Sequence, residues 1–240
     1  MFRIRLAGMT VEIDNRHNYV YELCRDYLCF DSAPAFRVAV STAETQAYQA
    51  ACGRPMTLPE AESHLLYRRI CERMPRYGVF LLHAAVVELD GRGYAFSARR
   101  GVGKSTHTEL WQTRFQGHAG ERYKATVING DKPLVRRTPD GRFWAFGTPW
   151  CGKEGLSTNT SVPLTDLCFI KRSASNETRP LDRGEALSLL LEQVVIPSGS
   201  GNIILVLDML DRLLSSCRLW EIGCNTDITA AEHSSSIILR

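Results

Sequence analysis

The sequence predicts an α/β fold with a mixed sheet, a small α+β appendage at the N-terminus and helices at the C-terminus. Residues 79–89 (VFLLHAAVVEL) are almost continuously apolar, which is typical of a strand covered on both faces. Residues 98–106 (ARRGVGKST) form a glycine-rich stretch between the apolar run 94–96 and a helical pattern. Farther along, residues 181–195 and 203–217 have the apolar spacing of amphipathic helices. These patterns favour a core of strands followed by helices.

The length, net charge and cysteine spacing of the chain limit the classes of protein to which it can belong. The 240 residues suit one large domain, or one domain with an appendage, and 44% hydrophobic residues are ordinary for a chain with a sizeable core. A net charge of +3, with 23% charged residues of both signs, gives no reason to expect a nucleic-acid partner. No apolar run of about 18 residues occurs, so no membrane span is expected. The eight cysteines lack CxxC and Cys/His metal spacing, and no signal-peptide pattern occurs, so we expect reduced thiols in the cytoplasm.

Residues 1–75 correspond to the predicted α+β appendage. Residues 2–13 alternate apolar and polar side chains, which predicts a strand or hairpin with one buried face, and residues 36–40 predict a short strand. Thr57 and Glu60 match a capping box that opens a helix, which Pro75 ends. This part of the sequence shows no chemical motif of its own.

The glycine-rich stretch is predicted to bind phosphate. Glycines allow the backbone to turn its N–H groups inward around an anion, and the start of the helix expected over residues 106–115 adds positive potential. A lysine here contacts the β- and γ-phosphates, and the following hydroxyl binds Mg²⁺. Ala98 replaces the first glycine of the usual pattern, and a plain glycine-rich turn between core elements is the alternative. The residues expected to bind nucleotide are Gly101, Val102, Gly103, Lys104, Ser105 and Thr106.

A second Mg²⁺ contact is expected from Asp131. Residues 125–129 predict a short strand, and Asp131 follows its C-terminal end, where such an aspartate lies when the strand neighbours the phosphate-loop strand. A structural role in a β-turn is the alternative. Residues 90–93 match the DxxG of GTPases, but they precede the phosphate loop and are predicted to form a hairpin turn.

The loop 147–155 (GTPWCGKEG) is the third distinctive stretch. It follows a hairpin predicted over residues 133–147, and its glycines and proline exclude a helix or a strand interior. Irregular loops of this kind tend to contact substrates, so we expect an exposed Trp150 and a substrate role for Lys153 and for Lys132. A structural connector is the alternative.

The C-terminal third is predicted to serve packing more than chemistry. A strand over residues 167–170 closes the predicted core, 78–172, and residues 197–201 read as a turn between the two long helices. Residues 218–222 predict a last strand, and Thr226 or Asp227 is expected to cap a final helix. The predicted domains are thus 1–75 and 76–240, with 173–240 as the helical part of the second.

The order His83-Ala-Ala, Gly101-Val-Gly-Lys-Ser105 and Asp131 resembles HPr kinase/phosphorylase and its relatives, which share a nucleotide-binding core with phosphoenolpyruvate carboxykinase. The sequence is most similar to a bacterial branch with GKSTH, DKP and GTPW-GK signatures, and the resemblance covers residues 80–172. It implies an active-site role for His83, which otherwise reads as a core histidine. It also implies two adjacent aspartates, where this sequence has Gly130-Asp131. The general base is therefore expected to be Asp131, His83 or a residue of the loop 147–155, which is predicted to contact the substrate.

The resemblance does not extend to the HPr kinase signature around its catalytic Glu and Arg, so neither the dephosphorylating activity nor the protein substrate is carried over. It implies an ATP- and Mg²⁺-dependent kinase that phosphorylates a hydroxyl of a small molecule or short peptide. His83, Lys104 and Asp131 would be catalytic, and Ser105 and Asp131 would hold the metal. ATP is the expected donor, and GTP or another phosphate donor is the alternative. Alternatives are a nucleotide-binding regulatory module without turnover, and a carboxykinase-type reaction, for which no metal-ligand cluster is recognisable. His107 would either face the site or pack in the core. Because HPr kinase relatives often assemble, the resemblance also allows a homo-oligomer.

Overall fold

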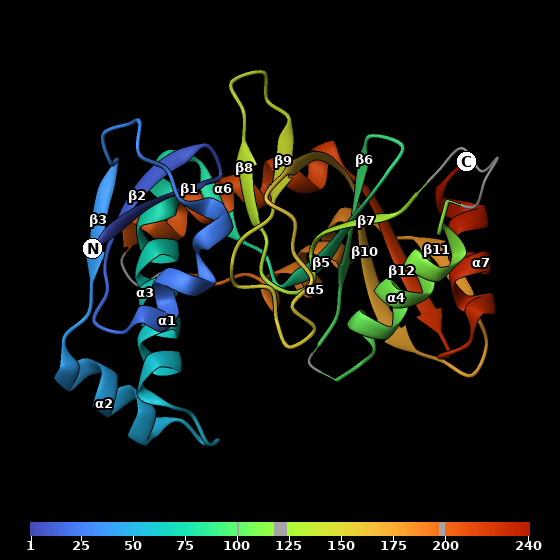
Figure 1. The fold of residues 1–240 in the computed structure, drawn as a ribbon. Coiled ribbons are helices and arrows are strands. Elements are labelled where there is room, and N and C mark those ends of the chain that lie inside the picture. The colour runs from blue at the N-terminus through green and yellow to red at the C-terminus, as the bar shows by residue number, and fades with distance from the viewer. Residues whose placement is uncertain (100, 118–123, 197–199) are drawn as a thin grey trace.

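The computed structural model describes residues 1–99, 101–117, 124–196 and 200–240 (Figure 1). Strands β1 (Phe2–Leu6) and β2 (Met9–Asp14) form the predicted antiparallel hairpin. Strand β3 (Phe36–Ala39) adds in parallel to β2, which confirms the short strand predicted near residue 36. This three-stranded sheet buries its apolar side chains against α3 (Leu58–Arg73).

Local capping explains where the N-terminal helices begin. At α3, Thr57 and Glu60 form the predicted capping box, and the helix passes into a 3₁₀ turn (Met74–Tyr77) that contains Pro75. A second capping box, from Ser41 and Glu44, starts α2 (Thr42–Ala51). Helices α1 (Asn18–Leu23) and α2 were not predicted from the sequence, nor was the 3₁₀ turn Arg25–Tyr27.

The central sheet has nine strands in the described residues. Its main path runs β4-β8-β9-β10-β6-β5-β7, with β12 beside β10 and β11 beside β12. The strands are β4 (Val79–Leu81), β5 (Ala84–Leu89), β6 (Arg92–Ser97), β7 (Thr126–Asn129), β8 (Leu134–Arg137), β9 (Phe143–Phe146), β10 (Ser161–Arg172), β11 (Glu177–Pro180) and β12 (Arg218–Cys224). The 90–93 turn and the β8–β9 hairpin are as predicted.

The prediction of one strand over residues 79–89 is wrong, because the run divides into β4 and β5. β4 pairs with β8, whereas β5 pairs with β6 and β7. Between them the backbone leaves the ladder: the N–H of Leu82 donates to Pro133 O (3.2 Å), and that of His83 to Gln193 O (2.7 Å). His83 therefore lies at a break between two parts of the sheet.

Strand directions bring the ends of several strands to one edge. β6, β10 and β12 are mutually parallel, and β7 runs the same way because both β6 and β7 are antiparallel to β5. The C-terminal ends of these four strands and the start of β5 therefore share an edge, the usual ligand-binding edge of such sheets. The expectation that Asp131 follows a strand adjacent to the phosphate-loop strand is wrong, since β5 lies between β6 and β7.

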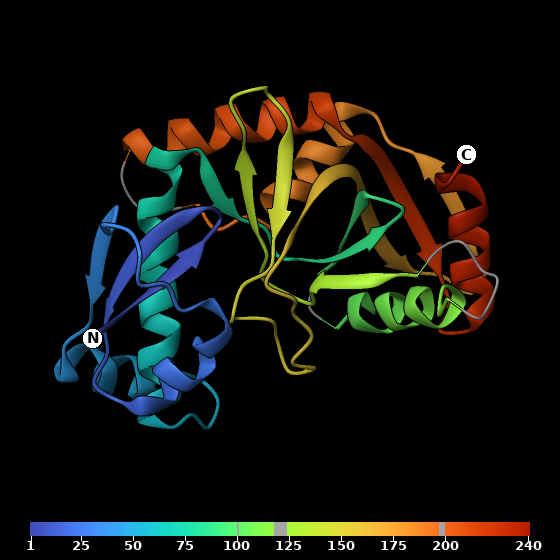
Figure 2. The same ribbon diagram turned by 45° about the horizontal axis from the view of Figure 1, so that its top comes forward.

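Helices cover both faces of this sheet (Figures 1 and 2). α5 (Arg183–Leu191) and α6 (Ser200–Ser216) pack on the face that carries Val86, and α4 (Lys104–Arg114) and α7 (Ile228–Ile238) pack on the face that carries Val87. This two-sided burial is what the apolar run in β5 predicted. Asp227 caps α7, one of the two predicted caps.

Residues 173–240 add β11 and β12 to the sheet as well as helices. Residues 197–199 of the predicted 197–201 turn lie outside the described residues. No helix in the described residues is both long and apolar enough to cross a membrane.

Candidate active site

A cleft of about 1180 Å³ lies where the N-terminal elements meet the shared strand edge. Figure 2 shows these elements (blue and teal) on one side and the start of α4 (green) on the other. One wall comes from α1, α3 and the α2–α3 loop, and the other from the phosphate-loop stretch and the ends of β7, β10 and β12. The predicted residues 101–106 line it, as do His83, Asp131, Lys132 and Lys153.

The glycine-rich loop has the backbone that the sequence predicts. Gly101 has φ +79° and Gly103 has φ +130°, and an added Cβ would meet nothing at either position, so the conformation alone requires glycine. α4 begins at Lys104, two residues before the predicted start, and Gly103 supplies no side-chain cap. The first N–H groups of α4 are therefore available to an anion. Arg100 lies outside the described residues.

Arg172, at the end of β10, holds this loop in place. Its Nη2 donates to Gly101 O (2.5 Å) and its Nε to Val102 O (3.2 Å). The guanidinium thereby adds positive charge next to the loop amides. The sequence analysis did not select Arg172, because no motif links the end of a strand to a loop about 70 residues earlier.

The three predicted catalytic side chains meet at one carboxylate oxygen. Asp131 Oδ1 accepts from Lys104 Nζ at 2.6 Å and lies 3.1 Å from His83 Nε2, while Oδ2 lies 3.8 Å from Lys132 Nζ. Burial alone would raise the pKa of Asp131, but hydrogen bonds from His83 and Lys104 outweigh it and hold the pKa well below its usual range. For Lys104, burial lowers the pKa and the bond to Asp131 opposes this. Asp131 is thus an anion throughout the physiological pH range.

Two buried amides, both missed from the sequence, fix this group. Asn129 Oδ1 accepts from the backbone N–H groups of Asp131 (2.9 Å) and Lys132 (2.6 Å). Its Nδ2 donates to Thr148 O (3.1 Å), which ties the turn to the 147–155 loop. Gln193 Oε1 lies 3.0 Å from His83 Nδ1 and orients the imidazole toward Asp131. An asparagine two residues before an aspartate at a strand end is a recognisable turn signal, whereas Gln193 carries no signal.

Trp150 is buried, which corrects the expectation that it is exposed. Its ring stacks on Tyr67 of α3, with centroids 4.1 Å apart and planes at 9°, and its Nε1 donates to Ser63 Oγ (3.0 Å). Tyr67 in turn donates its hydroxyl to Lys132 O (2.8 Å). The loop 147–155 is irregular, as predicted, but it is anchored on α3 by these buried contacts.

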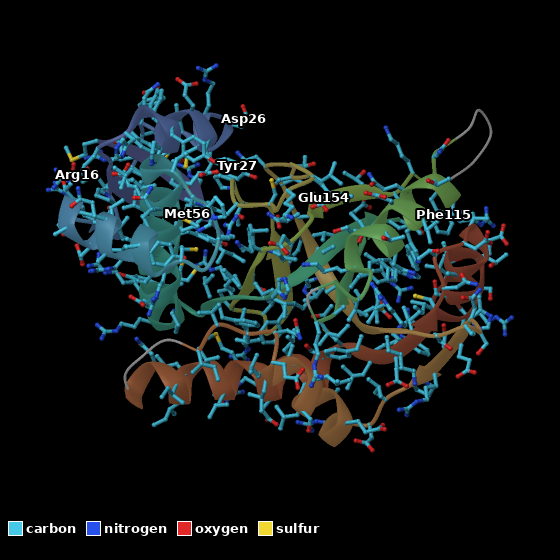
Figure 3. The ribbon with its side chains drawn as sticks, turned by 90° about the horizontal axis from the view of Figure 1, so that it is seen from below. Arg16, Asp26, Tyr27, Met56, Phe115 and Glu154 are labelled. Carbon is cyan, nitrogen blue, oxygen red and sulfur yellow. The ribbon has the colours of Figure 1, made fainter. Side chains whose placement is uncertain are left out.

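This loop also packs closely against Gly130, the residue before Asp131. A Cβ at Gly130 would lie 3.2 Å from Cys151 O and 3.4 Å from Leu156 O, so a larger side chain would be crowded against carbonyl oxygens. A Cβ at Gly152 would lie 3.4 Å from both Asp131 Cγ and Glu154 Oε2. The two carboxyl groups therefore flank the same glycine. Figure 3 shows Glu154 on this loop, and the sequence analysis did not select it.

Ser105 and Asp131 have the chemistry that Mg²⁺ requires. Both line the cleft, and hydroxyl and carboxylate oxygens suit a cation that takes its other ligands from water and phosphate. Within the described residues, no group of three or more His, Cys, Asp or Glu side chains is placed to hold a metal ion.

The side chain of His107 is buried between β6 and α7. It is 1% exposed, its ring centroid lies 5.1 Å from that of Phe96, and its Nε2 lies 3.3 Å from Ser234 Oγ. Burial lowers the pKa of His107 to about 4, from 6.5. Of the two roles considered for this residue, the structure supports packing.

This burial predicts a pH-dependent stability. Because the unfolded chain binds a proton more readily than the folded chain does, stability should be full above pH 6.5 and fall as the pH drops toward 4. The expected loss is about 3 kcal/mol of unfolding free energy. Urea unfolding of wild type and His107→Leu at pH 7.5 and at pH 4.5 should show a smaller drop in the variant. Equal drops would contradict this assignment.

No protein-family model matches the chain, and a comparison with curated proteins gives no significant match. Among solved structures, the chain is similar to one described as the HPr(Ser) kinase/phosphatase from Coxiella burnetii, at 12% sequence identity and a TM-score of 0.30. The match covers 55% of this chain and 94% of that chain. A TM-score this low does not by itself establish a common fold.

Proposed function

We propose that this protein is an ATP- and Mg²⁺-dependent phosphotransferase that phosphorylates a hydroxyl of a small molecule or short peptide. The observation that carries the proposal is the convergence of His83, Lys104 and Asp131 at the start of α4. A buried lysine beside free helix N-terminal amides is suited to phosphate, and an anionic carboxylate next to it is suited to a metal.

In this proposal the chain supplies alignment and charge. The amides of residues 101–106 and the ammonium of Lys104 bind the donor phosphates, and Arg172 fixes the loop that carries the amides. Ser105 and Asp131 hold Mg²⁺, which neutralises phosphate charge when bound. As the γ-phosphoryl group passes to the acceptor oxygen, its bond to the β–γ bridging oxygen breaks and ADP leaves, while the hydroxyl proton goes to a nearby base. Asp131, His83 and Glu154 are the candidates in the cleft.

A nucleotide-binding regulatory module without turnover is the second candidate. The sequence Gly130-Asp131 favours it, because the turn carries one carboxylate where the family resemblance implies two. The two candidates share the nucleotide site and differ in whether an acceptor is phosphorylated.

Calorimetric titration with ATP, with and without Mg²⁺, tests the shared nucleotide site. For wild type we expect Mg²⁺ to tighten binding by roughly tenfold or more, which is about 1.4 kcal/mol. Asp131→Asn should lose this enhancement, since a neutral amide is a poor Mg²⁺ ligand. ATP binding without Mg²⁺ should persist or strengthen in the variant, because Lys104 is released from its carboxylate partner.

Asp140→Asn is the matched control, because Asp140 lies in the exposed β8–β9 turn and pairs with Arg142. It should behave as wild type. ATP binding that ignores both Mg²⁺ and Asp131→Asn would contradict the metal role of Asp131 and favour the regulatory module.

A further inference from the structure

Four basic side chains line one side of the cleft, together with the acidic Glu60 and Glu154. Arg54 and His64 come from the N-terminal part, and Lys132 and Lys153 from the turn and loop that dock on it. We propose that this basic wall (Arg54, His64, Lys132 and Lys153) binds an anionic group of the phosphoryl acceptor, a carboxylate or phosphate. The inference rests on the proposed function, since it concerns the acceptor side of the same cleft.

Buried contacts hold this wall in shape. The hydroxyl of Tyr67 donates to Lys132 O (2.8 Å), and Lys132 N donates to Asn129 Oδ1 (2.6 Å), so the backbone of Lys132 is fixed from both sides. His64 lies three residues before Tyr67 on α3, and residues so spaced share one helix face. The bond that fixes Lys132 therefore brings the imidazole of His64 to the same side of the cleft.

The charges of the basic wall are partly compensated. Lys132 Nζ lies 3.8 Å from Asp131 Oδ2, whereas Arg54 and Lys153 form no ion pair within 4.0 Å in the described part of the chain. Glu60 faces the same space, but its Oε2 already accepts from Thr57 N (2.7 Å) and Thr57 Oγ1 (2.8 Å). Glu154 is the other acidic side chain on this side, and Asp131 is shared with Lys104 and His83.

The charged side chains around His64 also act on its imidazole. Burial lowers the pKa of His64, the positive charges of Lys132 and Arg54 lower it further, and Glu60 raises it. An anion bound among these groups would offset their repulsion. The donor phosphates have separate partners in Lys104 and the loop amides, so the basic wall is available to a second negatively charged molecule.

Tyr19, which is 45% exposed, and Leu23 also line the cleft and give it an aromatic and an apolar surface. A molecule that bridges this wall and the start of α4 would carry an anionic group at one end and a hydroxyl near Asp131. The chemical class is therefore a small hydroxy acid or phosphorylated alcohol, or a short acidic peptide with a serine or threonine.

Proton NMR of His64 in the full chain tests this without requiring turnover. The His64 signal is assigned by its loss in His64→Gln, and its pKa is measured with saturating succinate, with neutral succinamide, and without either. Succinate should raise the pKa of His64 by roughly one unit, and succinamide should not. Arg54→Gln should weaken succinate binding by about tenfold, whereas Arg68→Gln, on the exterior of α3, should leave it unchanged.

A second set of titrations, with peptides, distinguishes a small-molecule acceptor from a peptide acceptor. The peptides acetyl-Glu-Ser-Glu-amide and acetyl-Gln-Ser-Gln-amide are compared in the same titration, and tighter binding of the acidic peptide than of succinate would favour a peptide acceptor. A His64 pKa that no anion changes, or that succinamide changes equally, would overturn the proposal. Failure of the proposed nucleotide function is read separately, from the absence of ATP binding in the calorimetric titration of wild type.

Discussion

Replacing Lys104 by alanine is expected to reduce phosphoryl transfer by about 10²- to 10³-fold, the largest catalytic effect of any single change in the cleft. The ammonium is buried, with 10% of the side chain exposed, and its position at the first residue of α4 lets it reach both the loop and Asp131. No other described lysine lies within the glycine-rich loop or at the start of α4. Loss of this charge leaves the donor phosphates with loop amides alone, so affinity for ATP should fall as well.

The measurement is ATP binding by calorimetry and transfer to the acceptor class favoured by the NMR titration. Lys171→Ala is the matched control, because Lys171 is 53% exposed and pairs with Glu221 away from the cleft. Lys104→Arg keeps the charge but changes its shape, and should recover ATP affinity more than transfer. Full transfer by Lys104→Ala would refute the proposed function, provided that its circular dichroism spectrum matches wild type.

Trp150→Ala is expected to be the most destabilising substitution around the cleft, at about 3–5 kcal/mol of unfolding free energy. It would leave a cavity against Tyr67 and remove the donor to Ser63 Oγ. Because Tyr67 also holds Lys132, the loss should loosen the basic wall and weaken succinate binding.

Urea unfolding of Trp150→Ala, Trp150→Phe and Trp144→Ala measures this effect. Phenylalanine keeps an aromatic ring on Tyr67 and should cost clearly less than alanine. Trp144, which is only partly buried on β9, is the matched control and should cost least of the three. A loss below about 1 kcal/mol in Trp150→Ala would contradict the anchoring role of this side chain.

The sequence located the parts of the site that depend on local pattern. A glycine-rich turn between a strand and a helix sets its own backbone conformation, so residues 101–106 were recognisable without tertiary information. Asp131 was selected from its position two residues after a short buried strand, although that strand is not adjacent to β6 as expected. His83 required the family resemblance, since an imidazole in an apolar run has no local signature. The structure places His83 Nε2 and Lys104 Nζ within hydrogen-bonding distance of Asp131 Oδ1.

The features that could not be predicted from the sequence depend on contacts between segments that are far apart in the chain. Trp150 looks exposed in a loop of glycines, and its burial depends on Ser63 and Tyr67, of which Ser63 lies 87 residues earlier. The break between β4 and β5 occurs because backbone groups of Leu82 and His83 bond to Pro133 and Gln193. Hydrophobicity alone does not reveal it, since both halves of the run are buried. The basic wall is likewise assembled from segments that are far apart in the chain.

The side chains that support the cleft differ from those that would select its contents. Ser63, Tyr67 and Asn129 hold the walls together through buried hydrogen bonds, whereas Arg54 and Lys153 are exposed. Exchanges at such exposed positions usually change stability by no more than about 0.5 kcal/mol. Under the proposed function, the acceptor preference would therefore diverge by substitution at the rim while the framework stays constant, which would make the site a practical target for redesign.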